Sequence, residues 1–134
     1  MLLNEVRSTW QGRLARTGRA LRITADTDLP SSPASIAAVR QIVAVLIDNA
    51  VSHGVGTITV HARRADSTTA IDVSDEGTQL RQHDEAILFQ GRDTNSNHGI
   101  GLPLARSLAD AQGGRLRLTA TSPTTFTLFL PTQP

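Results

Sequence analysis

Two stretches of the chain repeat apolar residues at the spacing of an amphipathic helix. Residues 2–19 predict a first helix, with Gly18 as its stop. Residues 33–53 predict a longer helix, with Ser32 as N-cap and Pro33 as the first helical residue. The apolar stripe of this longer helix consists of Val39, Val43, Leu46, Ile47 and Ala50. We expect it to form the centre of the core.

Five shorter segments alternate apolar and polar side chains, as half-buried strands do. They cover residues 20–25, 57–63, 69–74, 115–120 and 125–130. A third helix is expected over residues 99–111, ended by Gly113 and Gly114. This order predicts an α/β (α+β) two-layer sandwich, in which a mixed β-sheet carries three main helices on one face. The length fits a single domain over residues 1–134.

Between the third strand and the third helix, residues 75–98 are polar and show no regular pattern. The short run Ala86, Ile87, Leu88 and Phe89 is the only apolar anchor in this segment. A long irregular insert inside a compact domain is usually functional. The segment is therefore predicted to form a lid over a binding site.

Composition narrows the functional classes. The hydrophobic share is 39% but aromatic residues make up only 3%, so Leu, Ile, Val and Ala must build the core. The formal net charge of +1 favours neither nucleic acid nor an acidic membrane as a partner. All 13 basic residues are Arg, which excludes a catalytic lysine. The absence of Cys suits a cytoplasmic location. The longest apolar run, residues 42–47, is too short to span a bilayer, so we expect no direct membrane contact.

Candidate chemistry begins at the end of the long helix. Asn49 and His53 are four residues apart and share a flank beside the apolar stripe, whereas Asp48 points elsewhere. An amide oxygen, a carboxylate and an imidazole in this place suit a hydrated Mg²⁺ and its phosphates. The alternative is that Asp48 and Asn49 merely fray the helix toward Gly54.

Two glycine clusters flank the predicted lid. Asp75 and Gly77 follow a strand, in a pattern that an ordinary surface turn would also show. Gly99 and Gly101 open the third helix, where backbone N–H groups and the helix dipole favour a phosphate. A dinucleotide-binding fingerprint needs a preceding strand and a P-loop needs a lysine, so neither motif is supported.

The remaining histidines show no metal-site pattern. His61 alternates along a strand and is expected to be structural or exposed. His83 and His98 lie in the lid segment without other ligands beside them.

The order of these motifs is more specific than any one of them. It resembles the ATP-binding catalytic domain of bacterial two-component sensor histidine kinases, within the gyrase, Hsp90, histidine kinase and MutL superfamily. The resemblance covers essentially the whole chain. The matching segments are residues 46–50 for the Asn-box, 75–77 and 99–102 for the glycine boxes, 88–89 for the Phe-box and 126–131 for the last strand.

The resemblance implies a Bergerat-type fold, with ATP and Mg²⁺ between the long helix, the lid and the second glycine box. By position, Asn49 would ligate Mg²⁺, and Asp48 would polarise the acceptor or take its proton. Asp75 would accept a hydrogen bond from the adenine amino group. The other residues expected around the nucleotide are His53, Gly77, Phe89, Gly99, Ile100, Gly101 and Leu102.

The implied reaction transfers the γ-phosphoryl group of ATP to a histidine on a separate dimerisation domain, with a response regulator downstream. No helix hairpin carrying such a histidine is predicted here. The chain therefore looks like an excised domain, in which residues 1–19 are the end of a connecting helix.

Three positions depart from the family pattern. Gln79 and Asn97 stand where the glycine boxes usually have glycine, and Val45 stands where sensor kinases often carry another Asn. Because Gln79 has a Cβ, its turn must either take another shape or carry strain. Two alternatives follow: a degenerate nucleotide-binding or protein-interaction module, and an anti-sigma-factor serine kinase. The latter group carries its catalytic Glu where this chain has Val45.

Overall fold

The computed structural model describes residues 2–90 and 101–131. The helices of the described part are α1 (Leu2–Ala15), α2 (Ile36–His53), α3 (Asp84–Leu88) and α4 (Gly101–Ala111). Its strands are β1 (Leu21–Ala25), β2 (Ile58–Ala65), β3 (Thr68–Ser74), β4 (Arg115–Thr121) and β5 (Thr124–Phe129). Apart from α3, which lies within the segment expected to be irregular, every element corresponds to a predicted one.

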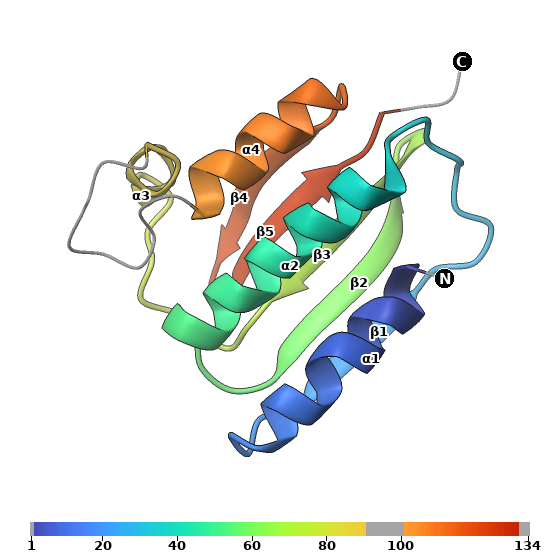
Figure 1. Cartoon of the computed structure of the whole chain (residues 1–134). Coiled ribbons are helices and arrows are strands. Elements are labelled where there is room, and N and C mark those ends of the chain that lie inside the picture. The colour runs from blue at the N-terminus through green and yellow to red at the C-terminus, as the bar shows by residue number, and fades with distance from the viewer. Residues whose placement is uncertain (1, 91–100, 132–134) are drawn as a thin grey trace.

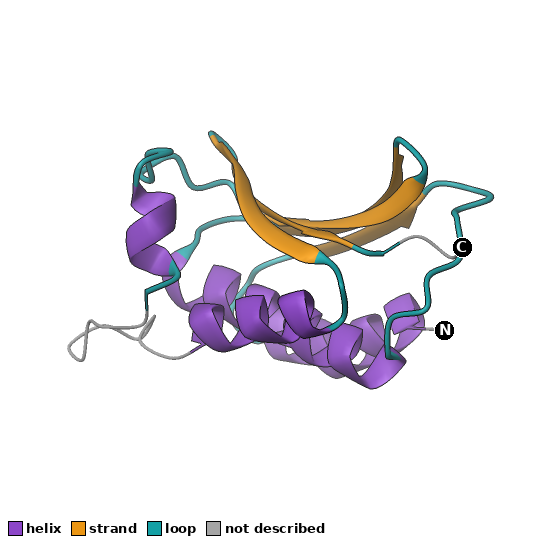
Figure 2. Ribbon diagram, turned by 90° about the horizontal axis from the view of Figure 1, so that it is seen from above, coloured by secondary structure: helices purple, strands orange, loops and turns teal. Residues whose placement is uncertain are grey.

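The strands form one sheet in the order β1-β2-β3-β5-β4. β1 runs parallel to β2, and the other neighbouring pairs are antiparallel. Helices α1, α2 and α4 cover one face of the sheet, and α3 stands at one end of the molecule (Figure 1, Figure 2). The predicted two-layer sandwich, with a mixed sheet and three main helices on one face, is confirmed.

The core lies between the sheet and α2. Ile58, Val60 and Ala62 of β2 point toward the helices and are buried, as their alternation predicted. The stripe of α2 is buried as a whole, and Val43 and Ile47 have no exposed surface. Full burial of one such aliphatic side chain contributes about 1.5–3 kcal/mol. The hydrophobic effect therefore fixes the position of α2 on the sheet, and with it the polar residues at its C-terminal end.

The predicted start of α2 is wrong. The helix begins at Ile36, and its N-cap is Ser35, whose Oγ accepts a hydrogen bond from the Ala38 N–H at 3.3 Å. Ser32 instead closes a local turn, because its Oγ accepts the N–H of Ala34 at 3.2 Å. Both serines are good caps. Ser35 is selected by a tertiary contact, since its own N–H donates to Gln112 Oε1 at 2.7 Å.

The predicted stop at Gly18 is confirmed, although α1 already ends at Ala15. Gly18 has a left-handed φ of 74°, which suits a residue without Cβ. The N–H groups of Gly18 and Arg19 donate to the carbonyls of Ala15 and Leu14 at 3.1 and 3.0 Å. This pair of bonds is the Schellman arrangement, which reverses the chain directly after the helix.

Helix α2 has 18 residues and a mean hydropathy of 1.2, values that would also suit a membrane span. The core helix of a globular domain has the same composition. Because α2 packs against α4, α1 and the sheet, we interpret it as the core helix.

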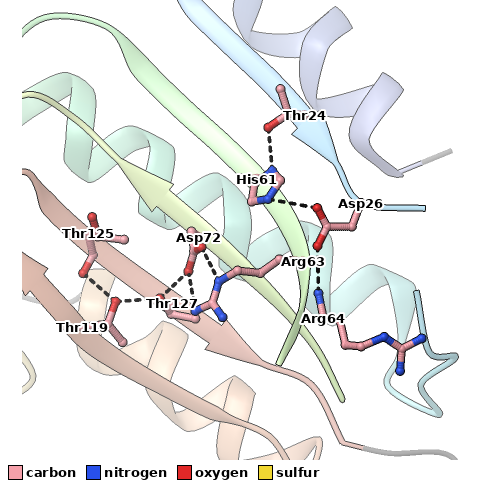
Figure 3. Close-up of polar contacts among 9 residues, drawn as sticks. All are labelled: Thr24, Asp26, His61, Arg63, Arg64, Asp72, Thr119, Thr125 and Thr127. Atoms are coloured by element: carbon pink, nitrogen blue, oxygen red, sulfur yellow. Dashed lines mark hydrogen bonds and ion pairs between the residues drawn. The ribbon is translucent and has the colours of Figure 1, made fainter. Parts of the chain in front are cut away.

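The opposite face of the sheet carries a polar network instead of a second apolar layer (Figure 3). Asp72 accepts hydrogen bonds from Arg63 Nε and Thr127 Oγ1, both at 2.6 Å. Thr127 Oγ1 also lies 2.7 Å from Thr119 Oγ1. The hydrogen bond from Arg63 to Asp72 raises the pKa of the guanidinium. Thr127 is buried and Asp72 is half-buried, and both are satisfied within the sheet, so no ligand is needed to explain them.

His61 lies on this outer face, away from α2. Its Nδ1 is 2.6 Å from Thr24 Oγ1, and its Nε2 is 3.4 Å from Asp26 Oδ1 (Figure 3). The structure therefore agrees with the expectation that His61 is a structural strand residue.

Candidate functional site

A cavity of about 360 Å³ opens at the C-terminal end of α2. Its walls come from the last turn of α2, the segment after β3, the end of α3 and the start of β5. Four of the predicted site residues line it: Asn49, His53, Asp75 and Gly77. A cavity of this size, mainly apolar with a few convergent polar groups, is typical of a small-molecule site.

Asp75 is the buried charge of this cavity, with 6% of its surface exposed. Its Oδ1 accepts the N–H of Gly77 at 2.6 Å and, in a longer contact of 3.4 Å, the N–H of Val55. Among the described residues no donor contacts Oδ2. One carboxylate oxygen is thus held by the backbone, while the other is available to a ligand that donates a hydrogen bond.

Two glycines leave room for this carboxylate. A Cβ on Gly77 would lie 2.6 Å from Asp75 Oδ1, and a Cβ on Gly54 would overlap the same carboxyl group. Gly77 belongs to the predicted motif, whereas Gly54 was expected only to end the helix. Its second role depends on a contact across the fold, which spacing along the sequence does not reveal.

Thr124 is a further residue of the cavity wall that the sequence analysis missed. It is 6% exposed, and both its N–H and its Oγ1 donate to the carbonyl of Gly77, at 2.9 and 3.1 Å. The N–H of Asp75 in turn donates to the carbonyl of Thr124 at 3.1 Å. The start of β5 therefore clamps the Asp75–Gly77 turn. The predicted strand began one residue later, at Thr125, which hid this contact.

A second cavity, of about 290 Å³, lies on the other side of Asn49 and His53, and both residues line both cavities. The second cavity also includes Asp48, Gly101 and Leu102. Asp48 is exposed and lines only this second cavity, as expected of a side chain that points away from its neighbour. Asn49 and His53 thus form a shared wall, with Asp75 on one side and Asp48 on the other.

Phe89 lines neither cavity but packs beside the first one. Its ring meets Phe126 edge to face, with centroids 6.0 Å apart and an interplanar angle of 83°. The guanidinium of Arg106 on α4 lies 4.9 Å above the Phe89 ring. Phe89 therefore joins the end of α3 to β5 and α4, which suits an anchor at the base of a lid.

The second glycine box is only partly described. Gly101 is the first residue of α4, and a Cβ there would make an ordinary contact of 3.5 Å with Val45. Leu102 is buried. Gly99 and Ile100 lie outside the described residues, as do His98 and Asn97, so the predicted phosphate contacts of this box stay predictions.

Gln79 lines the first cavity. The non-glycine residues with positive φ in the described part are Asp28 and Asp66. Gln79 is not among them, so the turn takes another shape and carries no left-handed strain. Of the two outcomes expected for this departure, the structure shows the first.

Helix α3 is fixed to strand β4 by a charged clamp. Arg117 donates two hydrogen bonds to Glu85, at 2.6 and 3.1 Å, and the N–H of Leu118 donates to the same carboxylate at 3.0 Å. Gln82 Nε2 donates to the carbonyl of Leu118 at 2.7 Å. The hydrogen bond from Arg117, opposed by burial and aided by that from Leu118, lowers the pKa of Glu85. The clamp places Leu88 at the first cavity and Phe89 beside it.

Within the described residues no group of three or more His, Cys, Asp or Glu side chains could hold a metal ion. His83 Nε2 lies 3.5 Å from Asp84 Oδ1. Among the described residues that line the cavities, Asn49 offers an amide oxygen that could hold a metal together with oxygen atoms of a bound ligand and water. Mg²⁺ is commonly held in this way beside phosphates, so the residues present fit it.

Residues 34–134 match the family model described as "Histidine kinase-, DNA gyrase B-, and HSP90-like ATPase". The chain belongs to this ATPase family. The resemblance stated from the motif order is thereby confirmed.

Two sequence relatives place this ATPase domain among sensor kinases. It is 27% identical over 124 residues to the adaptive-response sensory kinase SasA of Synechocystis sp., a match covering 86% of this chain and 32% of SasA. It is 31% identical over 116 residues to the sensor histidine kinase component HK1 of Mycobacterium tuberculosis, covering 80% of this chain and 67% of HK1. This ATPase domain thus spans about a third of one relative and two thirds of the other.

Solved structures show the same fold. Full-length ShkA in complex with AMPPNP superimposes with a TM-score of 0.85 at 23% identity, covering 98% of this chain and 29% of ShkA. The nucleotide-free catalytic domain of the histidine kinase ThkA superimposes with a TM-score of 0.84 at 18% identity, covering 99% of this chain and 93% of the ThkA domain. With the family match and the sensor-kinase relatives, they confirm the prediction of an ATP-binding catalytic domain.

Proposed function

We propose that this ATPase domain transfers the γ-phosphoryl group of ATP to a histidine on a separate helical dimerisation domain of its parent protein. A response regulator then receives the signal. The observation that carries this proposal is the shared wall: Asn49 and His53 separate a nucleotide-sized cavity containing Asp75 from a second cavity containing Asp48. With its base in the first cavity, ATP could extend its phosphates past Asn49 and His53 toward the second cavity, where the acceptor imidazole would meet the γ-phosphate beside Asp48.

The base of the nucleotide is proposed to lie in the first cavity. Oδ2 of Asp75 would accept a hydrogen bond from the adenine amino group, while Gly77 keeps this wall thin. Leu80, Leu88 and Phe126 supply apolar surface around the ring. A carboxylate in this position disfavours guanine, because the guanine carbonyl would place two acceptors face to face.

The phosphates are proposed to extend toward Asn49 and His53. Asn49, which lines both cavities, would ligate Mg²⁺ through its amide oxygen. When bound, the metal neutralises charge on the phosphate oxygens. His53 would approach the phosphates from the last turn of α2. Gly99, Ile100, Gly101 and Leu102 are proposed to close over them from the start of α4.

Asp48 is proposed as the catalytic partner of Asn49. Its exposed carboxylate lines the second cavity, which an incoming imidazole can enter. There it would polarise the acceptor or take its proton during transfer. We propose that the domain works in the cytoplasm, without nucleic acid and without direct membrane contact, whether or not its parent is membrane-anchored.

Calorimetry with ATP and GTP, with and without Mg²⁺, tests the nucleotide site. Wild-type protein should prefer ATP, and Asp75→Asn should weaken that preference. Equal affinity of the wild type for both nucleotides would refute the role of Asp75. No binding of ATP at all would favour the degenerate module.

A transfer assay with labelled ATP tests the chemistry. The domain alone should stay unlabelled, while an added dimerisation domain from its own parent should acquire acid-labile phosphate. Acid-labile label on this domain by itself would contradict the proposal. Acid-stable label on a serine of a partner would point to the anti-sigma-factor type of kinase.

A further inference from the structure

Arg19 connects the end of α1 to the end of α2. Its backbone completes the Schellman turn of α1, and its side chain reaches across to the last turn of α2. There Nη1 donates to the carbonyls of Ala50 and Val51 at 3.2 and 3.1 Å. The carbonyl of Ala50 also accepts the N–H of Gly54 at 2.9 Å. The carbonyl of Val51 lies in the last turn, where carbonyls lack partners within the helix and the dipole favours a cation. Arg19 thus caps the helix that carries Asn49.

The same guanidinium also holds the loop after α2. Arg19 Nε donates to the carbonyl of Gly56 at 2.8 Å. The N–H of the same peptide unit, that of Thr57, donates to Glu76 Oε2 at 2.5 Å. One peptide group is therefore held at both ends by opposite charges. Gly56 has a φ of 72°, and Glu76 occupies the space of its missing Cβ, so this geometry suits glycine alone.

This clamped loop borders the carboxylate of Asp75. The N–H of Glu76 donates to the carbonyl of Val55 at 2.8 Å, and the N–H of Val55 contacts Asp75 Oδ1 at 3.4 Å. Gly54, in the same loop, lies against the Asp75 carboxyl group. A shift of the loop would therefore move both the surface that Asp75 packs on and one of its donors.

We propose that Arg19 is a positioning residue for nucleotide recognition: together with Glu76 it fixes the Gly56–Thr57 peptide and so holds the carboxylate of Asp75 in register with the base. The role rests on the proposed binding of ATP. It goes beyond a helix cap, because a cap needs only Nη1, whereas the contact from Nε is made to the loop that supports Asp75.

Arg19 is half-buried. Its Nη2 is buried and, in the described structure, has no hydrogen-bond partner. An unsatisfied buried donor is costly, so the other three hydrogen bonds of the side chain must offset that cost. Because Arg19 directly follows the turn of α1, a displacement of α1 would reach the loop beside the base through this one side chain.

Arg19→Met tests the inference, with Arg16→Met as the matched control. Arg16 lies three residues earlier and is exposed, and its side chain makes no hydrogen bond or ion pair with the described residues. ADP and GDP affinities are measured by calorimetry at a temperature where all variants are folded. Arg19→Met should weaken ADP binding about five- to tenfold and GDP binding less, so that the ratio of the two affinities shrinks. Arg16→Met should match the wild type.

A second measurement needs no nucleotide. Hydrogen exchange of the Glu76 and Gly77 amides, which bond to Val55 and Asp75, should be faster in Arg19→Met than in the wild type and in Arg16→Met. In a double-mutant cycle, Glu76→Gln should add little to Arg19→Met, because both act on one peptide group.

The outcomes separate this inference from the proposed function. If wild-type protein binds ADP but Arg19→Met keeps both the affinity ratio and the exchange rates, the positioning role is overturned while ATP binding stands. An equal loss for ADP and GDP with unchanged exchange would show a cap only and would also overturn it. If the wild type binds no nucleotide, the proposed function fails, and faster exchange of the two amides still supports the role of Arg19 toward Asp75.

Discussion

Gly54→Ala offers a direct test of how the candidate site is built. The backbone of Gly54 has φ −95° and ψ −177°, an extended conformation that alanine adopts freely. The effect of the added methyl group is therefore steric. Its Cβ would overlap the Asp75 carboxyl group and would lie 2.7 Å from the carbonyl oxygen of Ala50. Either the carboxylate or the end of α2 must move.

The two ways of relieving this overlap have different costs. Extra volume in a packed region typically destabilises a protein by about 1–3 kcal/mol. If Asp75 turns away, the hydrogen bond from adenine to a charged group is also lost, which costs about 1.5–3 kcal/mol of binding. Since 1.4 kcal/mol is a factor of ten, we expect ADP affinity to fall roughly 10- to 100-fold. If Ala50 moves instead, the contact from Arg19 is weakened and stability falls more than affinity.

Calorimetric titration with ADP and thermal unfolding measure both quantities on the same variant. Gly12→Ala is the matched control, because a Cβ on Gly12 would meet nothing within 4 Å and the residue lies in the exposed part of α1. That control should gain about 0.5–1 kcal/mol of stability and keep the wild-type affinity. Wild-type affinity and wild-type stability in Gly54→Ala would refute the steric argument for the site.

Three further predictions concern the shared wall, the clamp of α3 and the turn after Gly77. Asn49→Ala should abolish Mg²⁺-dependent ATP binding with little change in melting temperature, whereas a large drop would show a structural role. In the clamp of α3, the contacts of Glu85 lower the pKa of its carboxyl group. The stability that Glu85 contributes is therefore present above its unfolded pKa of about 4.3 and is lost as the pH falls through the lower pKa of the folded state. The stability gap between wild type and Glu85→Gln in denaturant titrations should thus be constant near neutrality and shrink below about pH 4; a gap that persists in acid would contradict this. Gln79→Gly should leave ADP affinity within about twofold of the wild-type value, since Gln79 has no strained backbone to relieve. A roughly tenfold tighter binding would show that the turn is strained in the wild type.

The fold was largely predictable from side-chain pattern alone. Burial follows periodicity directly, so the stripe of α2 and the alternation of β2 identified both elements and their inward faces. The start of α2 was not predictable, because Ser32 and Ser35 are equivalent caps until Gln112 binds one of them. Local propensity narrows a boundary to a few residues, and a contact 77 positions away decides it.

The candidate site, like the fold, could be predicted from the sequence only in part. Asn49 and His53 share a wall because of helical spacing, and Asp75 with Gly77 forms a tight turn because of local geometry, so both pairs could be found in the sequence. Thr124 could not, because only the pairing of β3 with β5 brings it to that turn. The role of Gln79 depends on the conformation of the turn after Gly77, which motif order does not specify.

The clamp between α3 and β4 also protects the edge of the sheet. β4 is the last strand in the sheet order, so its outer backbone groups face no neighbouring strand. At Leu118 both groups are occupied, the N–H by Glu85 and the carbonyl by Gln82. Open strand edges pair with edges of other molecules and lead to aggregation. The contacts that hold α3 on β4 thus also shield part of this edge from a second copy of the domain. We therefore expect loss of the clamp to couple a loosened nucleotide site to self-association.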